Sequence, residues 1–211
     1  MDGILRKLPI GIQTFEKLRE GDYLYVDKTA LVWRIASTET PYFLSRPRRF
    51  GKSLLLSTFE AYFEGKKNLF EGLAIADMEK EWKTYPVFHL DLNAEKYDSP
   101  QALVEILSRQ LTQWELKYGK GEDEETLSGR FAGVIRRACE QSGRGVVVLV
   151  DEYDKPLLQA LGDDALLDDY RKTLKAFYGV LKSSDRYLRF VFLTGVTKFA
   201  QVSVFSDLNQ L

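Results

Sequence analysis

Several residue types and patterns are scarce in this chain of 211 residues. Its one cysteine, Cys139, excludes an internal disulfide framework and a cysteine-rich zinc site, and it indicates a reducing, cytoplasmic setting. The longest purely aliphatic run covers only 146–150, whereas a helix needs ~20 apolar residues to cross a membrane. The first three residues lack the basic and apolar parts of a signal peptide. We therefore expect a soluble, cytoplasmic protein.

An excess of charge of either sign is also absent. The chain has 30 Lys and Arg against 31 Asp and Glu, a formal net charge of −1. Such a balance excludes a protein-wide electrostatic attraction for nucleic acid, so any contact with nucleic acid would have to be local. Hydrophobic residues at 45% and charged residues at 29% are typical of a globular protein and exclude a disordered or fibrous chain.

From residue 41 onward, short apolar strand patterns alternate with amphipathic helix patterns. The strand patterns cover 42–44, 85–92, 146–150 and 189–194. The helix patterns cover 52–64, 100–118, 126–141 and 166–181. The run 146–150 is β-branched and apolar at almost every position, as expected of a central parallel strand. The alternation predicts an α/β fold, with a mainly parallel sheet that helices cover on both faces.

The most informative segment is SRPRRFGKS at 45–53, because it ends in the Gly-Lys-Ser of a phosphate-binding loop between a predicted strand and a predicted helix. Gly51 would let the backbone turn its N–H groups toward phosphate oxygens. Lys52 would reach the β- and γ-phosphates, and the Ser53 hydroxyl would bind Mg²⁺. The helix that begins at Lys52 would direct its positive end toward the same anion.

The segment departs from the usual loop at one position. Arg46 stands where the full pattern has its first glycine, and further arginines follow at positions 48 and 49. An ordinary basic turn between a strand and a helix is the alternative interpretation of the segment. The residues that we expect to bind the nucleotide are Arg46, Arg48, Arg49, Phe50, Gly51, Lys52, Ser53 and Leu54.

A second motif supports the first, because the apolar strand 146–150 runs directly into Asp151 and Glu152. This is the Walker B arrangement, in which Asp151 would help to hold Mg²⁺ and Glu152 would polarise the attacking water. Asp154 and Lys155 follow closely and would extend the polar cluster. The alternative for the two acidic residues alone is a solvated strand end.

The spacing of the two motifs leaves room for one intervening strand and several helices. P-loop ATPases with this topology place the strand after Walker B beside the phosphate loop and end it in a polar sensor. The strand pattern 189–194 then makes Thr194 the sensor candidate, with Thr197 and Lys198 behind it. A simple turn residue is the alternative for Thr194.

In combination, five motifs resemble the bacterial AAA-ATPase-like family. They are LPIG at 8–11, YVDKT at 25–29, RPRRFGKS at 46–53, VDEYDKP at 150–156 and LTGVTKF at 193–199. In that family the arginine-containing segment replaces the usual glycine-rich loop, so Arg46 is similar to a family trait. The resemblance implies ATP as ligand, and longer members resemble a fusion to a C-terminal PD-(D/E)XK nuclease-like domain.

The resemblance also suggests how the chain is divided. Residues 1–40 are expected to form an N-terminal helical or extended cap, and 41–211 a P-loop core that would need one more strand and is therefore truncated. Aromatic residues of the cap, namely Tyr23, Tyr25 and Trp33, would either line an adenine pocket or pack the cap onto the sheet. Asp27 and Lys28 are further candidates to face the site.

The remaining candidates for chemistry have simpler interpretations. His89, the single histidine, lies in a strand pattern and is expected to be structural. Asp91 would either join the site or cap a turn. Cys139 lies on the apolar stripe of its helix, so we expect it to pack in the core rather than act as a nucleophile.

Three functions remain open. The first is a Mg²⁺-dependent ATPase, with Lys52, Glu152 and Thr194 as catalytic residues and Ser53 and Asp151 as metal ligands. The second is a nucleotide-binding regulatory module with little hydrolysis, which Glu152 disfavours. The third is a nucleic-acid-associated accessory domain that uses the arginines of the loop, which the balanced charge disfavours.

Overall fold

The computed structural model describes residues 6–38, 40–93 and 96–197, and it contains a four-stranded, all-parallel sheet. The strands are β1 (Tyr42–Ser45), β2 (Val87–Asp91), β3 (Val146–Asp151) and β4 (Leu188–Gly195). Their order across the sheet is β1-β4-β3-β2. The predicted α/β class is confirmed, and so is the position of the fourth strand beside the strand of the phosphate loop. On its other side, β4 pairs with β3, the strand that ends in Asp151.

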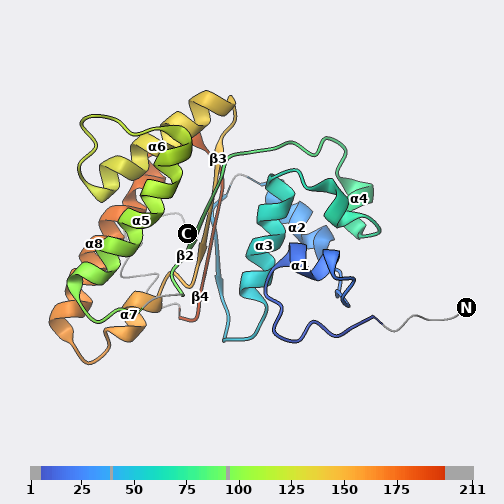
Figure 1. The fold of residues 1–211 in the computed structure, drawn as a ribbon, viewed down its shortest axis with the longest axis horizontal. Coiled ribbons are helices and arrows are strands. Elements are labelled where there is room, and N and C mark those ends of the chain that lie inside the picture. The colour runs from blue at the N-terminus through green and yellow to red at the C-terminus, as the bar shows by residue number, and fades with distance from the viewer. Residues whose placement is uncertain (1–5, 39, 94–95, 198–211) are drawn as a thin grey trace, which may run out of the picture.

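Helices cover both faces of this sheet (Figure 1). One face carries α5 (Pro100–Tyr118), α6 (Leu127–Ser142) and α8 (Asp164–Ser183). The other carries α3 (Lys52–Phe63), with α1 (Phe15–Glu20), α2 (Thr29–Ala36) and α4 (Ala74–Met78) outside it. The shorter elements are η1 (Lys67–Phe70), α7 (Lys155–Gln159) and η2 (Asp185–Tyr187). The long helices lie where the sequence predicts them, whereas the patterns did not indicate α4 or α7.

Strand β3 lies at the centre of the packing, because all six of its residues are buried. Val146, Val148 and Val150 contribute to the core on the α5–α6–α8 face, while Val147 and Leu149 contribute to the core on the α3 face. Each fully buried aliphatic side chain contributes about 1.5–3 kcal/mol of transfer free energy. The apolar run therefore fixes β3 firmly, and with it the position of the acidic residues at its end.

Helix α3 begins where Gly51 allows it to begin. Gly51 is the residue before the helix and has φ 75°, a left-handed conformation that favours glycine. Further along, the Phe59 ring lies 4.9 Å from that of Phe192, and the Phe63 ring lies 5.0 Å from that of Phe190. These contacts hold α3 against β4, so its N-terminus lies at the carboxyl edge of the sheet.

The N-terminal segment packs as a helical cap. Phe15, Val32 and Ala36 are buried in the same core as α3, and Tyr25 and Trp33 pack against it. These contacts favour packing over an adenine pocket for the cap aromatics.

The YVDKT motif of this segment anchors helices. The Asp27 carboxylate accepts hydrogen bonds from the N–H groups of Thr29 (2.8 Å) and Ala74 (2.7 Å), at the starts of α2 and α4. Burial opposes ionisation of this carboxyl group, but these hydrogen bonds outweigh it and lower the pKa of Asp27. Lys28 is exposed just before α2. Asp27 therefore has a structural role away from the sheet edge.

Within the described part of the chain, no helix is both long and apolar enough to cross a membrane.

Candidate active site

The carboxyl ends of three strands meet the N-terminus of α3 at one edge of the sheet. Ser45 ends β1, Asp151 ends β3 and Thr194 lies one residue before the end of β4. Lys52 is the first residue of α3. In open parallel α/β sheets, ligands bind at this edge. The fold therefore brings together the two segments that the sequence predicts to form one site.

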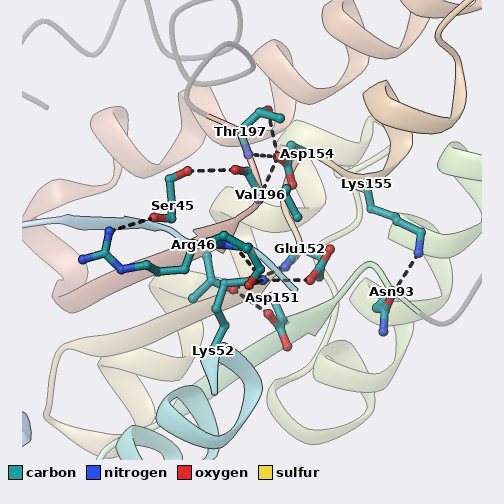
Figure 2. A network of polar contacts seen from close by, with 12 residues as sticks. Ser45, Arg46, Lys52, Asn93, Asp151, Glu152, Asp154, Lys155, Val196 and Thr197 are labelled. Atoms are coloured by element: carbon teal, nitrogen blue, oxygen red, sulfur yellow. Dashed lines mark hydrogen bonds and ion pairs between the residues drawn. The ribbon is translucent and has the colours of Figure 1, made fainter. Parts of the chain in front are cut away.

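Lys52 joins the two segments. Its side chain is almost fully buried, and its Nζ donates to the carbonyl oxygens of Arg46 (3.1 Å) and Pro47 (3.2 Å). The same Nζ lies 3.3 Å from Oε1 of Glu152. Figure 2 shows this cluster between the loop after β1 and the turn after β3. The lysine thus folds back onto its own loop and pairs with the predicted water-activating residue.

Glu152 carries two features that are costly for a structural residue. Its φ of 53° is left-handed, although it is not a glycine. Its side chain is only 10% exposed, and Oε2 is buried without a hydrogen-bond partner among the described residues. A strained backbone and an unpaired buried acceptor are both features that persist at functional sites.

Asp151 is held by the predicted sensor. The Thr194 hydroxyl donates to Oδ1 of Asp151 at 2.5 Å and accepts a weaker bond from the N–H of Glu152 at 3.4 Å. Both side chains are buried. Thr194 therefore contacts the carboxylate predicted to hold the metal, which a turn residue would not need to do.

The basic loop, residues 46–50, is exposed. Its left-handed residues are Arg49 (φ 67°) and, just beyond, Gly51, so Arg46 at the first-glycine position does not need the conformation that glycine provides. The Arg46 guanidinium turns back toward the Ser45 carbonyl oxygen (3.5 Å) and away from Lys52 (Figure 2). Phe50 is 68% exposed. In this structure the Arg46 side chain therefore points away from Lys52, and Arg48 and Arg49 are exposed to solvent.

The helical part of the predicted loop lies closer to the core than residues 46–50. Ser53, the second residue of α3, is half-buried at the same helix end as Lys52. Leu54 is half-buried and packs against the core on the α3 face. The placement of Ser53 is compatible with a metal ligand, whereas the Leu54 side chain serves packing.

On the far side of Glu152, two polar residues form a rim. The Lys155 Nζ donates to Oδ1 of Asn93 at 3.0 Å (Figure 2). Asp91, the register partner of Asp151, accepts the N–H of Asn93 at 2.8 Å and so caps a turn. The Lys155 side chain therefore contacts Asn93 at this rim, and Asp91 follows the turn-capping alternative.

His89 and Cys139 lie outside this cluster. The His89 Nδ1 lies 2.9 Å from Oε2 of Glu60, on α3. Burial disfavours its charged form, but the hydrogen bond to Glu60 outweighs burial and raises the pKa of His89. Cys139 is half-buried against the helical core, and burial raises the pKa of its thiol. Lys198, predicted to lie behind the sensor, falls outside the described residues.

Comparison with known proteins agrees with this geometry. A family model described as "Predicted AAA-ATPase" matches residues 9–205. The chain belongs to the AAA-ATPase-like family. The match covers the described sheet and every site segment above. As a member of this family, the chain carries a predicted ATPase domain.

A curated relative from Azotobacter chroococcum mcd 1, "Uncharacterized protein in vnfD 5'region", is 44% identical over 207 residues. The alignment covers 98% of this AAA-ATPase-like chain and 40% of the relative. The chain therefore spans less than half of the length of the curated relative that it matches. No solved structure matches it significantly.

Proposed function

We propose that this domain binds Mg²⁺-ATP and hydrolyses it to ADP and phosphate. One observation carries the proposal. Lys52 Nζ and Glu152 Oε1 lie 3.3 Å apart, the two side chains are only 4% and 10% exposed, and Oε2 of Glu152 is buried without a hydrogen-bond partner among the described residues. Family membership supports the nucleotide, because the family is described as a predicted ATPase. Lys52 would bind the β- and γ-phosphates, with the N-terminus of α3 directed at the same charge.

The donor set fits a divalent cation. Two successive carboxyl groups, those of Asp151 and Glu152, are buried at the sheet edge, where Glu152 pairs with the buried ammonium group of Lys52. Among the described residues, no three His, Cys, Asp or Glu side chains cluster as a protein-only metal centre. Mg²⁺ sites of NTPases have this character, since one carboxylate and a hydroxyl share the ion with water and phosphate oxygens. Asp151 and Ser53 would hold Mg²⁺, which when bound neutralises charge on the phosphate oxygens.

Glu152 would act on the attacking water. Its unpaired Oε2 would accept a proton from that water while the water oxygen bonds to the γ-phosphorus. The bond between the γ-phosphorus and the β,γ-bridging oxygen breaks, and ADP leaves with the bonding electron pair. Thr194 would keep Asp151 oriented throughout, through its 2.5 Å hydrogen bond.

Two variants test the proposal. Saturating Mg²⁺-ATP, at about a hundred times its Kd, should stabilise the wild type by about 2.7 kcal/mol in thermal unfolding. Lys52→Ala should lose this stabilisation. Glu152→Gln should keep it, yet release phosphate about 10²- to 10⁴-fold more slowly. Lys66→Ala, which removes a surface lysine paired with Glu64, is the matched control and should change neither measurement.

Three results would contradict parts of the proposal. No stabilisation of the wild type at millimolar Mg²⁺-ATP would exclude ATP as the ligand. Unchanged phosphate release in Glu152→Gln would remove this residue from the mechanism. Stabilisation without any turnover in the wild type would favour a nucleotide-binding regulatory module instead.

The exposure of the basic loop favours a second candidate, an accessory domain for nucleic acid. Arg48, Arg49 and Phe50 point a positive and aromatic surface outward, the combination that binds single strands. Oligonucleotide binding that falls steeply with salt and ignores ATP would support this candidate.

A further inference from the structure

Asp154 is a fully buried carboxylate with an unusually complete set of donors. Its Oδ2 accepts the N–H of Val196 (2.9 Å), the N–H of Thr197 (2.7 Å) and the Thr197 hydroxyl (2.9 Å). Its Oδ1 accepts a longer bond from the Val196 N–H (3.2 Å). Figure 2 shows these bonds converging from the segment after β4. A buried carboxylate is expensive unless such donors satisfy it, so this arrangement is specific.

The neighbouring Tyr153 reinforces the same contact. Its N–H donates to the Thr194 carbonyl oxygen (2.9 Å), and its hydroxyl donates to the Thr197 carbonyl oxygen (2.6 Å). Gly195 lies between them, where an added Cβ would come within 2.8 Å of Oδ1 of Asp154 and closer still to the Tyr153 ring. Only glycine therefore lets the turn after β3 approach the end of β4 this closely.

The opposite side of segment 194–197 contacts the start of the phosphate loop. The Ser45 hydroxyl donates to the Val196 carbonyl oxygen (3.0 Å), and the Arg46 N–H donates to the Gly195 carbonyl oxygen (3.1 Å). The segment therefore lies between the loop that carries Lys52 and the turn that carries Glu152. Its first residue, Thr194, is also the one that binds Asp151.

We propose that Asp154 is a positioning residue for the hydrolysis reaction, a proposal that rests on the function above. By fixing segment 194–197 from one side, Asp154 holds the Thr194 hydroxyl on Asp151 and holds Ser45 and Arg46 at the edge of the sheet. It touches neither Lys52 nor the reacting atoms, so it acts through Thr194 and the loop. A displacement of about 1 Å at a catalytic group is enough to cost about 10²-fold in rate.

Asp154→Asn is the test variant. It keeps the size of the side chain but replaces one acceptor oxygen by an NH₂ donor, which faces an N–H or hydroxyl donor whichever way the amide is oriented. We expect kcat for Mg²⁺-ATP hydrolysis to fall about ten- to a hundredfold, while KM changes less than about threefold because Lys52 and the N-terminus of α3, which would bind the phosphates, do not contact Asp154. Asp163→Asn is the matched control: Asp163 also accepts a backbone N–H, that of Leu166 (3.0 Å), but it lies at the start of α8. It should leave both constants unchanged.

Amide hydrogen exchange provides a readout that does not depend on turnover. In Asp154→Asn, exchange should quicken at Val196 and Thr197 and also at the indirectly held amides of Arg46 and Tyr153. Faster exchange at Val196 and Thr197 alone would overturn the inference that Asp154 acts on the phosphate loop through segment 194–197.

The kinetic outcomes separate this inference from the proposed function. Wild-type kcat in Asp154→Asn, with Lys52→Ala inactive, would overturn the inference and leave the ATPase intact. A wild-type chain without turnover would overturn both the ATPase and the positioning role. An equal loss of kcat in Asp154→Asn and Asp163→Asn would reduce the effect to general destabilisation and overturn the inference as well.

Discussion

Two buried ion pairs of this molecule differ in how completely they are satisfied. In the helical layer, Arg130 of α6 and Glu115 of α5 form a bidentate pair with bonds of 2.8 and 2.7 Å. Ser108 and Thr112 accept the other guanidinium hydrogen bonds. At the sheet edge, Lys52 and Glu152 are 3.3 Å apart.

The two pairs differ in the hydrogen bonding of the carboxylate oxygens and in the backbone conformation of the glutamate. Both carboxylate oxygens of Glu115 are bonded, and its backbone is helical. Glu152 has a left-handed backbone and an oxygen with no partner among the described residues. A complete pair serves the fold, whereas an incomplete pair has capacity for a ligand. The comparison therefore favours the sheet edge as the functional region, without reference to any motif.

Breaking the complete pair should have the largest effect. Glu115→Ala would leave the Arg130 guanidinium buried without its carboxylate, so the free energy of unfolding should fall by about 3–5 kcal/mol. Urea unfolding measures this change. The double variant Glu115→Leu/Arg130→Met should recover much of the loss, since it removes both charges. A loss below about 1 kcal/mol in Glu115→Ala would contradict the structural role of this pair.

The strained backbone at Glu152 predicts a smaller effect on the free energy of unfolding. Glycine should be more stable than alanine at this position, which is the reverse of their order within a helix. Glu152→Gly and Glu152→Ala remove the same carboxylate, so they differ chiefly in the cost of the left-handed backbone. Glu152→Gly should be more stable than Glu152→Ala by about 1 kcal/mol. At the exposed helical residue Glu105 of α5, the glycine variant should instead be less stable than the alanine variant, by about 0.5–1 kcal/mol. The same sign at both positions would contradict the strain.

The smallest effect on the free energy of unfolding is expected at the Glu60–His89 pair, which joins α3 to β2. The pKa of His89 is raised, so its charge with Glu60 stabilises the fold fully below the unfolded pKa of about 6.5 and loses this effect as pH rises through the folded pKa. Asp91 and Asp151 also favour the charged form. Glu60→Gln should therefore destabilise more at pH 5.5 than at pH 9 in urea unfolding. Glu64→Gln, whose partner Lys66 stays charged over this range, is the control. If Glu60→Gln lowers the free energy of unfolding equally at both pH values, the pairing of charged His89 with Glu60 does not contribute to stability.

The sequence predicted those parts of the fold that depend on local patterns. The apolar run 146–150 indicated a central strand, and Gly51 with Lys52 indicated the start of α3; both are confirmed. Helix α7 has five residues, too few to show a helical period, so the pattern missed it.

The finer geometry of the site could not be predicted, because it depends on contacts between distant segments. Spacing suggested that Thr194 belongs to the site, but not that its hydroxyl binds Asp151. The turning away of Arg46 follows from the loop conformation, which the arginine-rich composition does not encode in any simple pattern. The left-handed backbone of Glu152 had no sequence signal, since such a conformation is normally indicated by glycine or asparagine.

The strand order has a consequence for how the protein is made. Strand β4 is the last strand of the described chain along the sequence, yet it lies between β1 and β3 and is hydrogen-bonded to both. While the ribosome is still synthesising the preceding residues, β1 has no neighbour on that side, and β3 presents an unpaired edge. Such edges are open to mispairing and to chaperones. Strand β4 also carries Thr194, so when it forms, a nascent chain joins the described strands into one sheet and brings together the two halves of the candidate site in the same step.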